Sequence, residues 1–348
     1  MGKGKKVTIN DIATKASTSK TTVSFYLNGK FDKMSPDTKR RIEQAINETK
    51  YSPSIMARSL KSKKSNLIGV VVADITNPFS NNIVKGIDDV ARKEGYQILV
   101  GSSNFEYNNE KKYIDRMLDM GVDGFIVQPT LNFNKLIKTI QDRGKKIVVL
   151  DSVNKEFKGR WVKTNNYDIT SKATRELFKE GYEEFILVTE DPKLLMARME
   201  RKNGFEDSLK ELGAKYSTLI IENDINYEDL AKLLREKINK DKKTLIFAIN
   251  GRTLQKVFMT SKKEKWNVPN EIGIIGFDNW DWTFYASPSV TTIDQPTYEE
   301  GTYAASILID MLQEKGDIEE STIFECSINW AESTNINEKP LEHREFQS

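Results

Sequence analysis

From residue 66 onward the sequence alternates short apolar runs with longer amphipathic segments. The runs are LIGVVVADI (67–75), YQILVGSS (96–103), GFIVQPT (124–130), KIVVLD (146–151), EFILVTE (184–190), STLIIEN (217–223), TLIFAIN (244–250) and EIGIIGFD (271–278). Strands that alternate with helices in this way predict parallel sheets covered by helices on both faces. The series divides near residues 151–166, so we expect an α/β core with two similar halves.

The segment NNIVKGIDDVARKEG (81–95) shows the helical pattern. Ile83, Ile87 and Val90, with Val84 and Ala91, fall along one face. No GxGxxG follows the first strand, and no Walker motif occurs in the sequence. A nucleotide-binding interpretation of these strands therefore has no local support.

The first 50 residues predict three short helices. Thr8 and Asp11 form a capping-box pattern, Ser19 is placed to cap a second helix, and Ser35-Pro36 is a strong third start. Two short helices separated by a few residues, with small hydroxyl and basic side chains on the second, are typical of a helix-turn-helix that binds the major groove. Small helical bundles that bind no DNA have similar spacing, so the spacing alone leaves both open.

Charge separates this head from the rest of the chain. Residues 1–64 hold 15 Lys and Arg against 5 Asp and Glu, whereas the whole chain has a formal net charge of only +2. The remainder must therefore carry −8. A basic head on an acidic body favours a polyanionic partner such as nucleic acid over a merely solvated tail.

Several classes are made unlikely by residue counts. One cysteine, Cys326, excludes an internal disulfide and suits a reducing compartment. The only histidine, His343, lies in a polar C-terminal stretch, which argues against a histidine triad or multi-histidine metal site. No apolar run has the length of a membrane span or signal peptide. We expect a cytoplasmic protein with no metal, cofactor or membrane partner.

Four ordered motifs resemble the LacI family of sugar-responsive bacterial transcription regulators. They are VTINDIATKASTSKTTVSFYLNGK (7–30), YSPSIMARSLKSKKSNLIGVVVADITNPF (51–79), VPNEIGIIGFDN (268–279) and SVTTIDQP (289–296). The likeness covers about residues 7–335. It implies an all-α helix-turn-helix domain (1–52), a hinge segment (53–64), a two-lobed core like a periplasmic binding protein (65–335) and a polar tail (336–348). The implied lobes are 65–163 with 291–325, and 164–290 with 326–335.

The resemblance also implies which residues meet DNA. These are Thr8, Ser19, Lys20, Thr21, Thr22, Ser24, Phe25, Asn28, Tyr51, Ala57 and Leu60. In the family the hinge becomes helical on operator DNA and inserts a leucine into the minor groove, the position that Leu60 occupies here. The chain departs from the family at Phe25, where arginine is common, and at Ser17 and Thr18, where Gly-Val is usual. We therefore expect an altered operator preference, with polar contacts from Lys20, Thr21 and Ser24.

An effector site is implied between the lobes. Its candidate residues are Phe79, Arg201, Tyr227, Asn250, Asp278, Trp282 and Gln295. Charged and amide side chains can grip sugar hydroxyls, while an aromatic face can cover the ring. Gly251 stands where the family has an aspartate, so that edge of the site is altered. Arg198 beside Arg201 favours a sugar acid among possible effectors.

The sequence thus predicts a transcription regulator, most simply a dimeric repressor of carbohydrate-use genes on a near-palindromic operator. A small sugar or sugar-acid effector would control its DNA affinity. The tail lacks leucine heptads, so nothing indicates a coiled-coil tetramer. Two alternatives are a sugar enzyme and a transport binding protein, each with a basic appendage. The hinge-like segment, the basic head and the absence of a signal peptide weigh against both.

Overall fold

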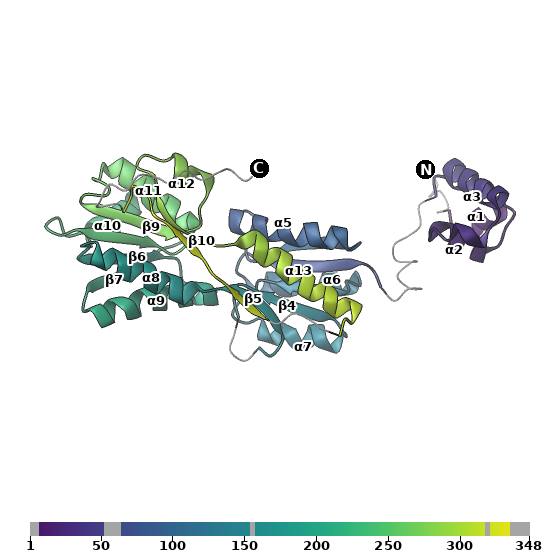
Figure 1. The fold of residues 1–348 in the computed structure, drawn as a ribbon, viewed down its shortest axis with the longest axis horizontal. Coiled ribbons are helices and arrows are strands. Elements are labelled where there is room, and N and C mark those ends of the chain that lie inside the picture. The colour runs from purple at the N-terminus through teal and green to yellow at the C-terminus, as the bar shows by residue number, and fades with distance from the viewer. Residues whose placement is uncertain (1–6, 52–63, 154–156, 317–320, 335–348) are drawn as a thin grey trace. The chain divides into compact units, whose positions relative to one another are not determined.

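The computed structural model describes residues 7–51, 64–153, 157–316 and 321–334 (Figure 1). It divides into two compact units, Met1–Ser65 and Asn66–Ser348. Each unit is considered by itself below. Within the described ranges, no helix combines the length and the apolar character needed to cross a membrane.

The first unit contains the three predicted helices: α1 (Ile9–Lys15), α2 (Lys20–Leu27) and α3 (Pro36–Thr49), with a short 3-10 turn η1 (Phe31–Lys33) before α3. Their predicted caps are confirmed. Thr8 and Asp11 complete a capping box, and the side chains of Ser19 and Ser35 accept backbone N–H groups of α2 and α3. Local cap chemistry therefore set these helix starts, as expected for short polar-flanked helices.

The core of this unit is small. Its buried members are Ile12, Ala13, Ala16, Val23, Ile42 and Ala45. The turn between α1 and α2 places Ser17 at φ 49°, a left-handed conformation that favours glycine. The turn nevertheless closes, because the Thr18 N–H donates to the Ala13 carbonyl at 2.9 Å. The turn is thus hydrogen-bonded with serine at this left-handed position.

The first lobe of the second unit is built on an all-parallel sheet in the order β11-β5-β4-β3-β1-β2. The strands are β1 (Leu67–Val72), β2 (Gln97–Ser102), β3 (Gly124–Val127), β4 (Lys146–Leu150), β5 (Arg160–Thr164) and β11 (Thr322–Phe324). The helices are α5 (Pro78–Lys93), α6 (Tyr107–Asp119), α7 (Asn134–Asp142) and α13 (Thr297–Gln313). The predicted strand and helix alternation is confirmed here.

The second lobe repeats this plan in the order β12-β10-β9-β8-β6-β7. Its strands are β6 (Glu184–Thr189), β7 (Lys215–Ile220), β8 (Thr244–Ala248), β9 (Ile272–Phe277), β10 (Thr291–Asp294) and β12 (Ser327–Asn329). Its helices are α8 (Asn166–Lys179), α9 (Met196–Leu212), α10 (Tyr227–Arg235), α11 (Gly251–Glu264) and α12 (Asp281–Tyr285), with a 3-10 turn η2 (Pro192–Leu194). One pair, β10 with β12, is antiparallel, so the sheet is not wholly parallel as expected.

The chain passes between the two sheets three times, between β5 and α8, between β10 and α13, and between β11 and β12. One predicted boundary is wrong. Residues 291–294 form β10, which pairs with β9 and β12 in the second sheet, whereas the sequence placed them in the first lobe. The second crossing therefore follows this strand and does not precede it.

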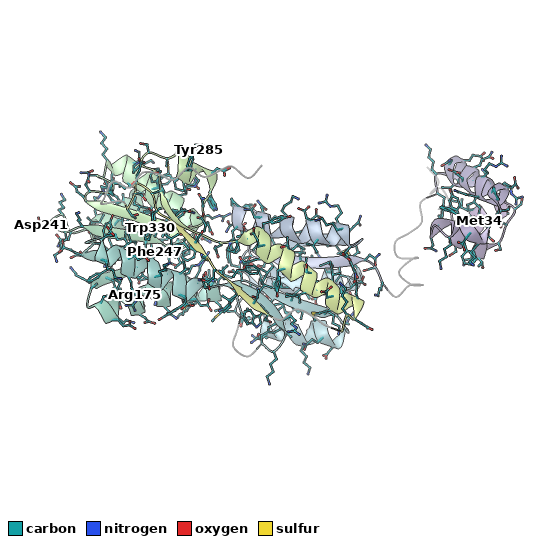
Figure 2. All side chains as sticks on the ribbon, viewed as in Figure 1. Met34, Arg175, Asp241, Phe247, Tyr285 and Trp330 are labelled. Atoms are coloured by element: carbon teal, nitrogen blue, oxygen red, sulfur yellow. The ribbon has the colours of Figure 1, made fainter. Side chains whose placement is uncertain are left out.

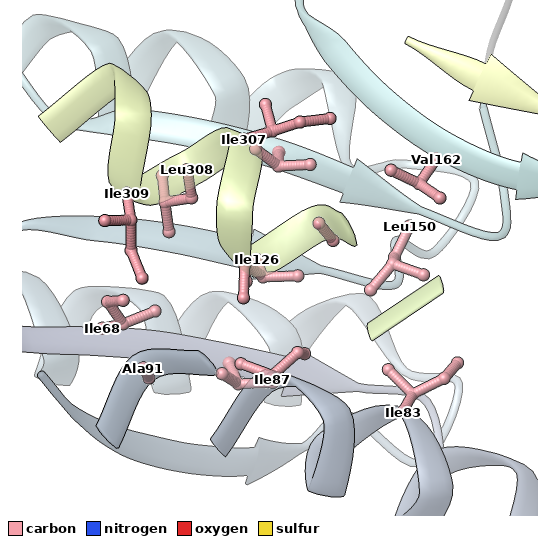
Figure 3. Packing of buried hydrophobic residues seen from close by; sticks show 14 of the residues in the cluster. Ile68, Ile83, Ile87, Ala91, Ile126, Leu150, Val162, Ile307, Leu308 and Ile309 are labelled. Carbon is pink, nitrogen blue, oxygen red and sulfur yellow. The ribbon is translucent and has the colours of Figure 1, made fainter. Parts of the chain in front are cut away.

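Apolar faces of helices cover both sheets. Figure 3 shows Ile83 and Ile87 of α5 and Ile307 and Leu308 of α13 gathered over strand residues such as Ile126. In the second lobe an aromatic row runs through Phe205, Phe247 (labelled in Figure 2) and Phe277, with neighbouring ring centroids 5.6 and 6.3 Å apart. These packed interiors fix the carboxyl ends of the strands, where such sheets hold ligands.

Candidate functional site

The exposed face of α2 carries the residues predicted to read DNA. Lys20, Thr21 and Asn28 are exposed, while Ser24 and Phe25 are partly exposed. Val23 is the fully buried member of the helix. A face of one cation, small polar groups and one aromatic ring has the size and chemistry of a major-groove reading surface.

Other predicted DNA residues have structural roles in the same unit. The Ser19 hydroxyl accepts the Thr22 N–H at 3.0 Å, and the Asn28 amide donates to the Ser24 carbonyl at 2.7 Å. Tyr51 packs against the small core. These bonds fix the two ends of α2. The predicted hinge residues Ala57 and Leu60 lie outside the described residues.

The second unit contains a cleft between its lobes, with about 430 Å³ of space that opens to solvent. Its lining residues are Ala73, Asp74, Asn77, Phe79, Ser80, Phe105, Gln128, Asp151, Leu195, Ala197, Arg198, Arg201, Asn250, Asp278 and Gln295. Most follow the carboxyl ends of strands or begin the helices after them, as the fold rule predicts. Five predicted effector residues, Phe79, Arg201, Asn250, Asp278 and Gln295, are among them.

Arg201 is the best-satisfied group of the cleft. Its Nε donates to Asn166 Oδ1 at 2.7 Å, Nη1 to the Ile249 carbonyl at 3.0 Å and Nη2 to Gln295 Oε1 at 2.7 Å. The guanidinium also lies 3.7 Å from the ring centroid of Phe277. This buried cation is therefore held rigidly from three sides.

Gln295 joins Arg201 to Asp278 across the second chain crossing. Its Nε2 donates to Asp278 Oδ1 at 2.6 Å, and Asp278 Oδ2 accepts the Gly251 N–H at 3.2 Å. Asp278 directly follows β9 with φ 72°, a left-handed conformation that points to a functional constraint. Because Gln295 sits on the crossing, the network couples the cleft to the segment about which the lobes would move.

A second polar group surrounds Glu190, which follows β6. Asn250 caps α11 through its Oδ1 and donates from Nδ2 to Glu190 Oε2 at 2.7 Å. Arg198 Nη2 lies 3.7 Å from the same carboxylate oxygen. Burial lowers the pKa of the Arg198 guanidinium, and the Glu190 charge opposes that effect.

The first lobe contributes Asp151 at the end of β4. One carboxylate oxygen accepts from Gln128 Nε2 at 2.8 Å, and the other has no hydrogen-bond partner among the described residues. Burial raises the pKa of Asp151, and the charge of Arg201 works in the opposite direction. Gln128 is in turn held by the Ala73 N–H at 2.9 Å. This unpaired oxygen is buried in the wall of the cleft.

Polar contacts also join the lobes directly. Arg252 Nη1 lies 2.6 Å from Asp74 Oδ2, and its Nη2 donates to Thr76. Lys163 of β5 pairs with Glu200 of α9 at 2.6 Å. These contacts hold the lobes in the relative position that defines the cleft.

Two predicted effector residues are wrong as cleft residues. Tyr227 begins α10, where the Lys263 ammonium lies 4.4 Å from its ring centroid. Trp282 packs against the second-lobe core, 5.3 Å from Phe258 between ring centroids. Both rings cover α11 because that helix presents apolar and aliphatic surface to them. Neither lines the cleft.

Sequence reasoning missed Asp74, Phe105, Gln128 and Asp151. A signal was present for three of them, because a polar residue follows the apolar stretch in LIGVVVADI (Asp74), GFIVQPT (Gln128) and KIVVLD (Asp151). Phe105 had no such signal. It reaches the cleft through a loop in which Asn104 and Phe105 are both left-handed, at φ 50° and 62°.

The cleft combines carboxylates and amides, which can hydrogen-bond to hydroxyl groups, with two aromatic residues, Phe79 and Phe105. Such a site suits a small polyhydroxylated ligand. Within the described part of the chain, no group of three or more His, Cys, Asp or Glu side chains is arranged to hold a metal ion.

Comparison with known families agrees with both sites. Residues 65–331, more than half of the chain, match a family described as periplasmic binding proteins and sugar binding domain of the LacI family. Residues 8–54 match the bacterial regulatory proteins of the lacI family. The cleft and the α2 surface each lie inside one of these matches.

Individual proteins show the same likeness. The HTH-type transcriptional regulator KdgR of Bacillus subtilis is 31% identical over 309 residues, covering 88% of this chain and 91% of KdgR. The lac repressor dimer bound to operator and the anti-inducer ONPF has a similar fold, with a TM-score of 0.80, 20% identity and coverage of 95% and 99% of the two chains. The regulator CelR in complex with cellobiose has a TM-score of 0.67, 20% identity and coverage of 94% and 99%.

Proposed function

We propose that this chain, which belongs to the LacI family of bacterial regulatory proteins, represses carbohydrate-use genes under the control of a small carbohydrate bound in the cleft. It is a helix-turn-helix transcription regulator with a core of the sugar-binding type. The relatives that it matches are named as regulators and not as enzymes. The proposal therefore concerns the effector, the assembly and the way they control DNA binding.

The observation that carries the effector proposal is the chain of bonds from Arg201 through Gln295 to Asp278. It places a cation, an amide and a carboxylate along one wall, while Asp151 lines the cleft from the other lobe with one carboxylate oxygen that has no partner among the described residues. A sugar that bonds to both walls would favour one angle between the lobes. Its binding free energy would then bias an equilibrium that the DNA also biases, so the coupling must be reciprocal.

We propose that two copies act together on a near-palindromic operator in the cytoplasm. A two-fold dimer presents two α2 faces, and half-sites on DNA mirror that symmetry. The lac repressor, similar in fold, was seen as a dimer on operator DNA. Measurement of mass in solution, with and without a duplex selected from a random library, tests the dimer. A monomer on DNA would contradict it.

For the predicted hinge, residues 53–64, we keep the proposal made from the sequence that Leu60 enters the minor groove. Leu60→Ala should weaken binding to the selected duplex far more than binding to unrelated DNA, because the wedge acts only at a deformable base step. Equal losses on both duplexes would contradict this role. Lys20→Ala is the matched comparison, since loss of a phosphate contact weakens binding to both.

Thermal unfolding with neutral sugars, sugar acids and sugar phosphates tests the effector. A compound at one hundred times its Kd should stabilise the fold by about 2.7 kcal/mol. Asp278→Asn should abolish the effect of that compound on DNA binding and leave DNA affinity within a few-fold. An unchanged response in this variant would exclude Asp278 from the site, while loss of DNA binding itself would indicate a folding role.

A further inference from the structure

We propose that Arg198 and Phe105 form a subsite for an anionic oxygen group on the effector, the carboxylate of a sugar acid or the phosphate of a sugar phosphate. The inference rests on the effector function proposed above and specifies its chemical class. It concerns two residues outside the Arg201 network. One comes from each lobe, so the subsite exists only when the lobes are in this relative position.

Arg198 differs from Arg201 in how its donors are used. It lies in the first turn of α9, is 6% exposed and lines the cleft. Its nearest carboxylate, Glu190, is 3.7 Å from Nη2, longer than a hydrogen bond, and Nη1 has no hydrogen-bond partner among the described residues. Each of the three side-chain nitrogens of Arg201, by contrast, donates to an oxygen. A buried guanidinium with an open nitrogen is costly unless a ligand completes it.

Phe105 holds this guanidinium in place from the opposite lobe. The Arg198 Cζ lies 4.9 Å from the ring centroid of Phe105, within the range of a cation–π contact. Two consecutive residues of this loop, Asn104 and Phe105, are left-handed. This conformation is unfavourable for a residue other than glycine. Backbone strain at a ligand-facing aromatic residue indicates that the ring position is functionally constrained.

Helix ends add to the positive potential. The N-termini of α5, α9 and α11 reach the cleft through Asn77, Leu195 and Asn250. Asparagine side chains cap α5 and α11, whereas α9, which carries Arg198, has no side-chain cap. The partial positive charge at such an end favours an anion close to it.

The acidic residues of the cleft do not cancel this preference. Asp74 is paired with Arg252, and Asp278 accepts from Gln295 and the Gly251 N–H. Asp151 is buried beside Gln128, and burial favours its neutral form. Arg198 has the Glu190 carboxylate near it only at 3.7 Å, beyond hydrogen-bond distance, and its Nη1 has no partner among the described residues. A neutral sugar would leave that charge unmatched, whereas an anionic group would meet it.

The test uses the full-length protein and matched probes at equal ionic strength. The anionic probes are D-glucuronate, D-galacturonate, D-gluconate and the two hexose 6-phosphates, and the neutral probes are D-glucose and D-galactose. Calorimetry and thermal unfolding should show that at least one anionic probe binds roughly 10-fold or more tightly than its neutral parent. Comparison of the sugar acids with the sugar phosphates shows whether the anionic group is a carboxylate or a phosphate.

Arg198→Met should weaken the anionic probe by roughly 10- to 100-fold and leave any neutral-sugar affinity within a few-fold. Arg198→Lys keeps the charge and should lose less. Arg175→Met is the matched control, because Arg175 is on α8, paired with Glu211 and outside the cleft lining (Figure 2). It should bind as the unaltered protein does. If Arg198→Met fails to fold by circular dichroism, Phe105→Leu replaces it, with an expected several-fold loss for the anionic probe alone.

Each result decides between the two proposals. Tight binding of a neutral sugar with no anionic preference overturns the subsite and leaves the effector function standing. Anionic binding that Arg198→Met and Phe105→Leu do not change also overturns it. If no probe binds, the result counts against both the subsite and the carbohydrate effector. Selection of DNA by the head is measured separately.

Discussion

The two lobes share a sheet plan but anchor their crossing helices differently. In the first lobe α13 packs on α5 through two glycines (Figure 1). A Cβ on Gly301 would lie 2.2 Å from the Ile83 carbonyl oxygen, and one on Gly86 would lie 2.3 Å from the Tyr298 oxygen. These contacts are backbone to backbone, so neither helix can yield by turning a side chain.

In the second lobe α8 packs on α9 through one glycine and a polar contact. A Cβ on Gly204 would lie 2.4 Å from the Tyr167 carbonyl oxygen, and Ser208 donates to the Ser171 hydroxyl at 2.7 Å. Both α8 and α13 begin directly after a chain crossing. Close helix packing therefore anchors both crossings, but the first lobe does so with less room to adjust.

The buried polar groups of these helices differ as well. Glu300, next to Gly301, is fully buried, and neither carboxylate oxygen has a partner among the described residues. Burial raises its pKa well above the usual range, with Asp151 acting in the same direction and Arg201 against it. In α8, by contrast, buried Thr170 and Thr174 donate to backbone carbonyls at 2.7 and 2.8 Å. Among the described residues, α13 thus buries a carboxyl group without partners, whereas the buried side-chain atom of α8 that lacks a partner is the amide nitrogen of Asn166.

The largest effect is expected for Gly301→Ala. The added methyl meets backbone, so we expect a loss of about 3 kcal/mol in the free energy of unfolding, even though alanine favours helix. Denaturant unfolding followed by circular dichroism measures it. Gly316→Ala, where nothing lies within 4 Å of the added atom, should be nearly neutral. A neutral Gly301→Ala would mean that the helices can separate freely.

Gly204→Ala should cost less, about 2 kcal/mol, because only one glycine shapes that contact. The same unfolding measurement ranks the two lobes. If Gly204→Ala proves more damaging than Gly301→Ala, the proposed difference between the helix pairs is wrong.

Glu300→Met should stabilise the protein by about 1–2 kcal/mol at pH 8, because it removes a buried carboxyl without partners. Since the folded pKa is raised, ionisation of the unfolded chain lowers stability as pH rises above about 4.3 toward the folded pKa. The gain should shrink as pH falls to 4. Because the pKa of Asp151 is also raised, the variant should retain part of the dependence of stability on pH. A gain that does not change with pH would show that charge is not its cause.

The smallest effect is expected at the ion pair that joins the lobes. Arg252→Met combined with Asp74→Asn in a double-mutant cycle should give a coupling free energy of about 0.5 kcal/mol, because Arg252 is partly solvated. Added salt should reduce the coupling. A coupling several times larger would contradict the expectation that solvent screens this pair.

The sequence predicted the long, strongly patterned elements well. The eight apolar runs all became strands, and the helix starts at Thr8, Ser19 and Ser35 were set by local caps. It missed β5, β11 and β12 and treated β10 only as a motif. These strands are short, as in RWVKT and SIN, and β11 pairs with β5 across 160 residues of sequence (Thr322 with Val162). Residue pattern alone has no access to that pairing.

The candidate cleft shows the same division. Sequence motifs identified Phe79, Arg201, Asn250, Asp278 and Gln295, because each stands at a fixed place beside a strand or crossing. Tyr227 and Trp282 were misplaced, since the direction of an aromatic side chain depends on what packs beside it.

The sequence by itself determined the basic head, the alternating α/β core and the polar residues at the strand ends, because these follow from local patterns of charge, hydrophobicity and capping. Only the tertiary structure decided that β10 belongs to the second sheet, that Phe105 meets Arg198 across the cleft and that Glu300 is buried without partners. Each of these depends on contacts between segments far apart in the chain, and packing energy, not local preference, selects among them.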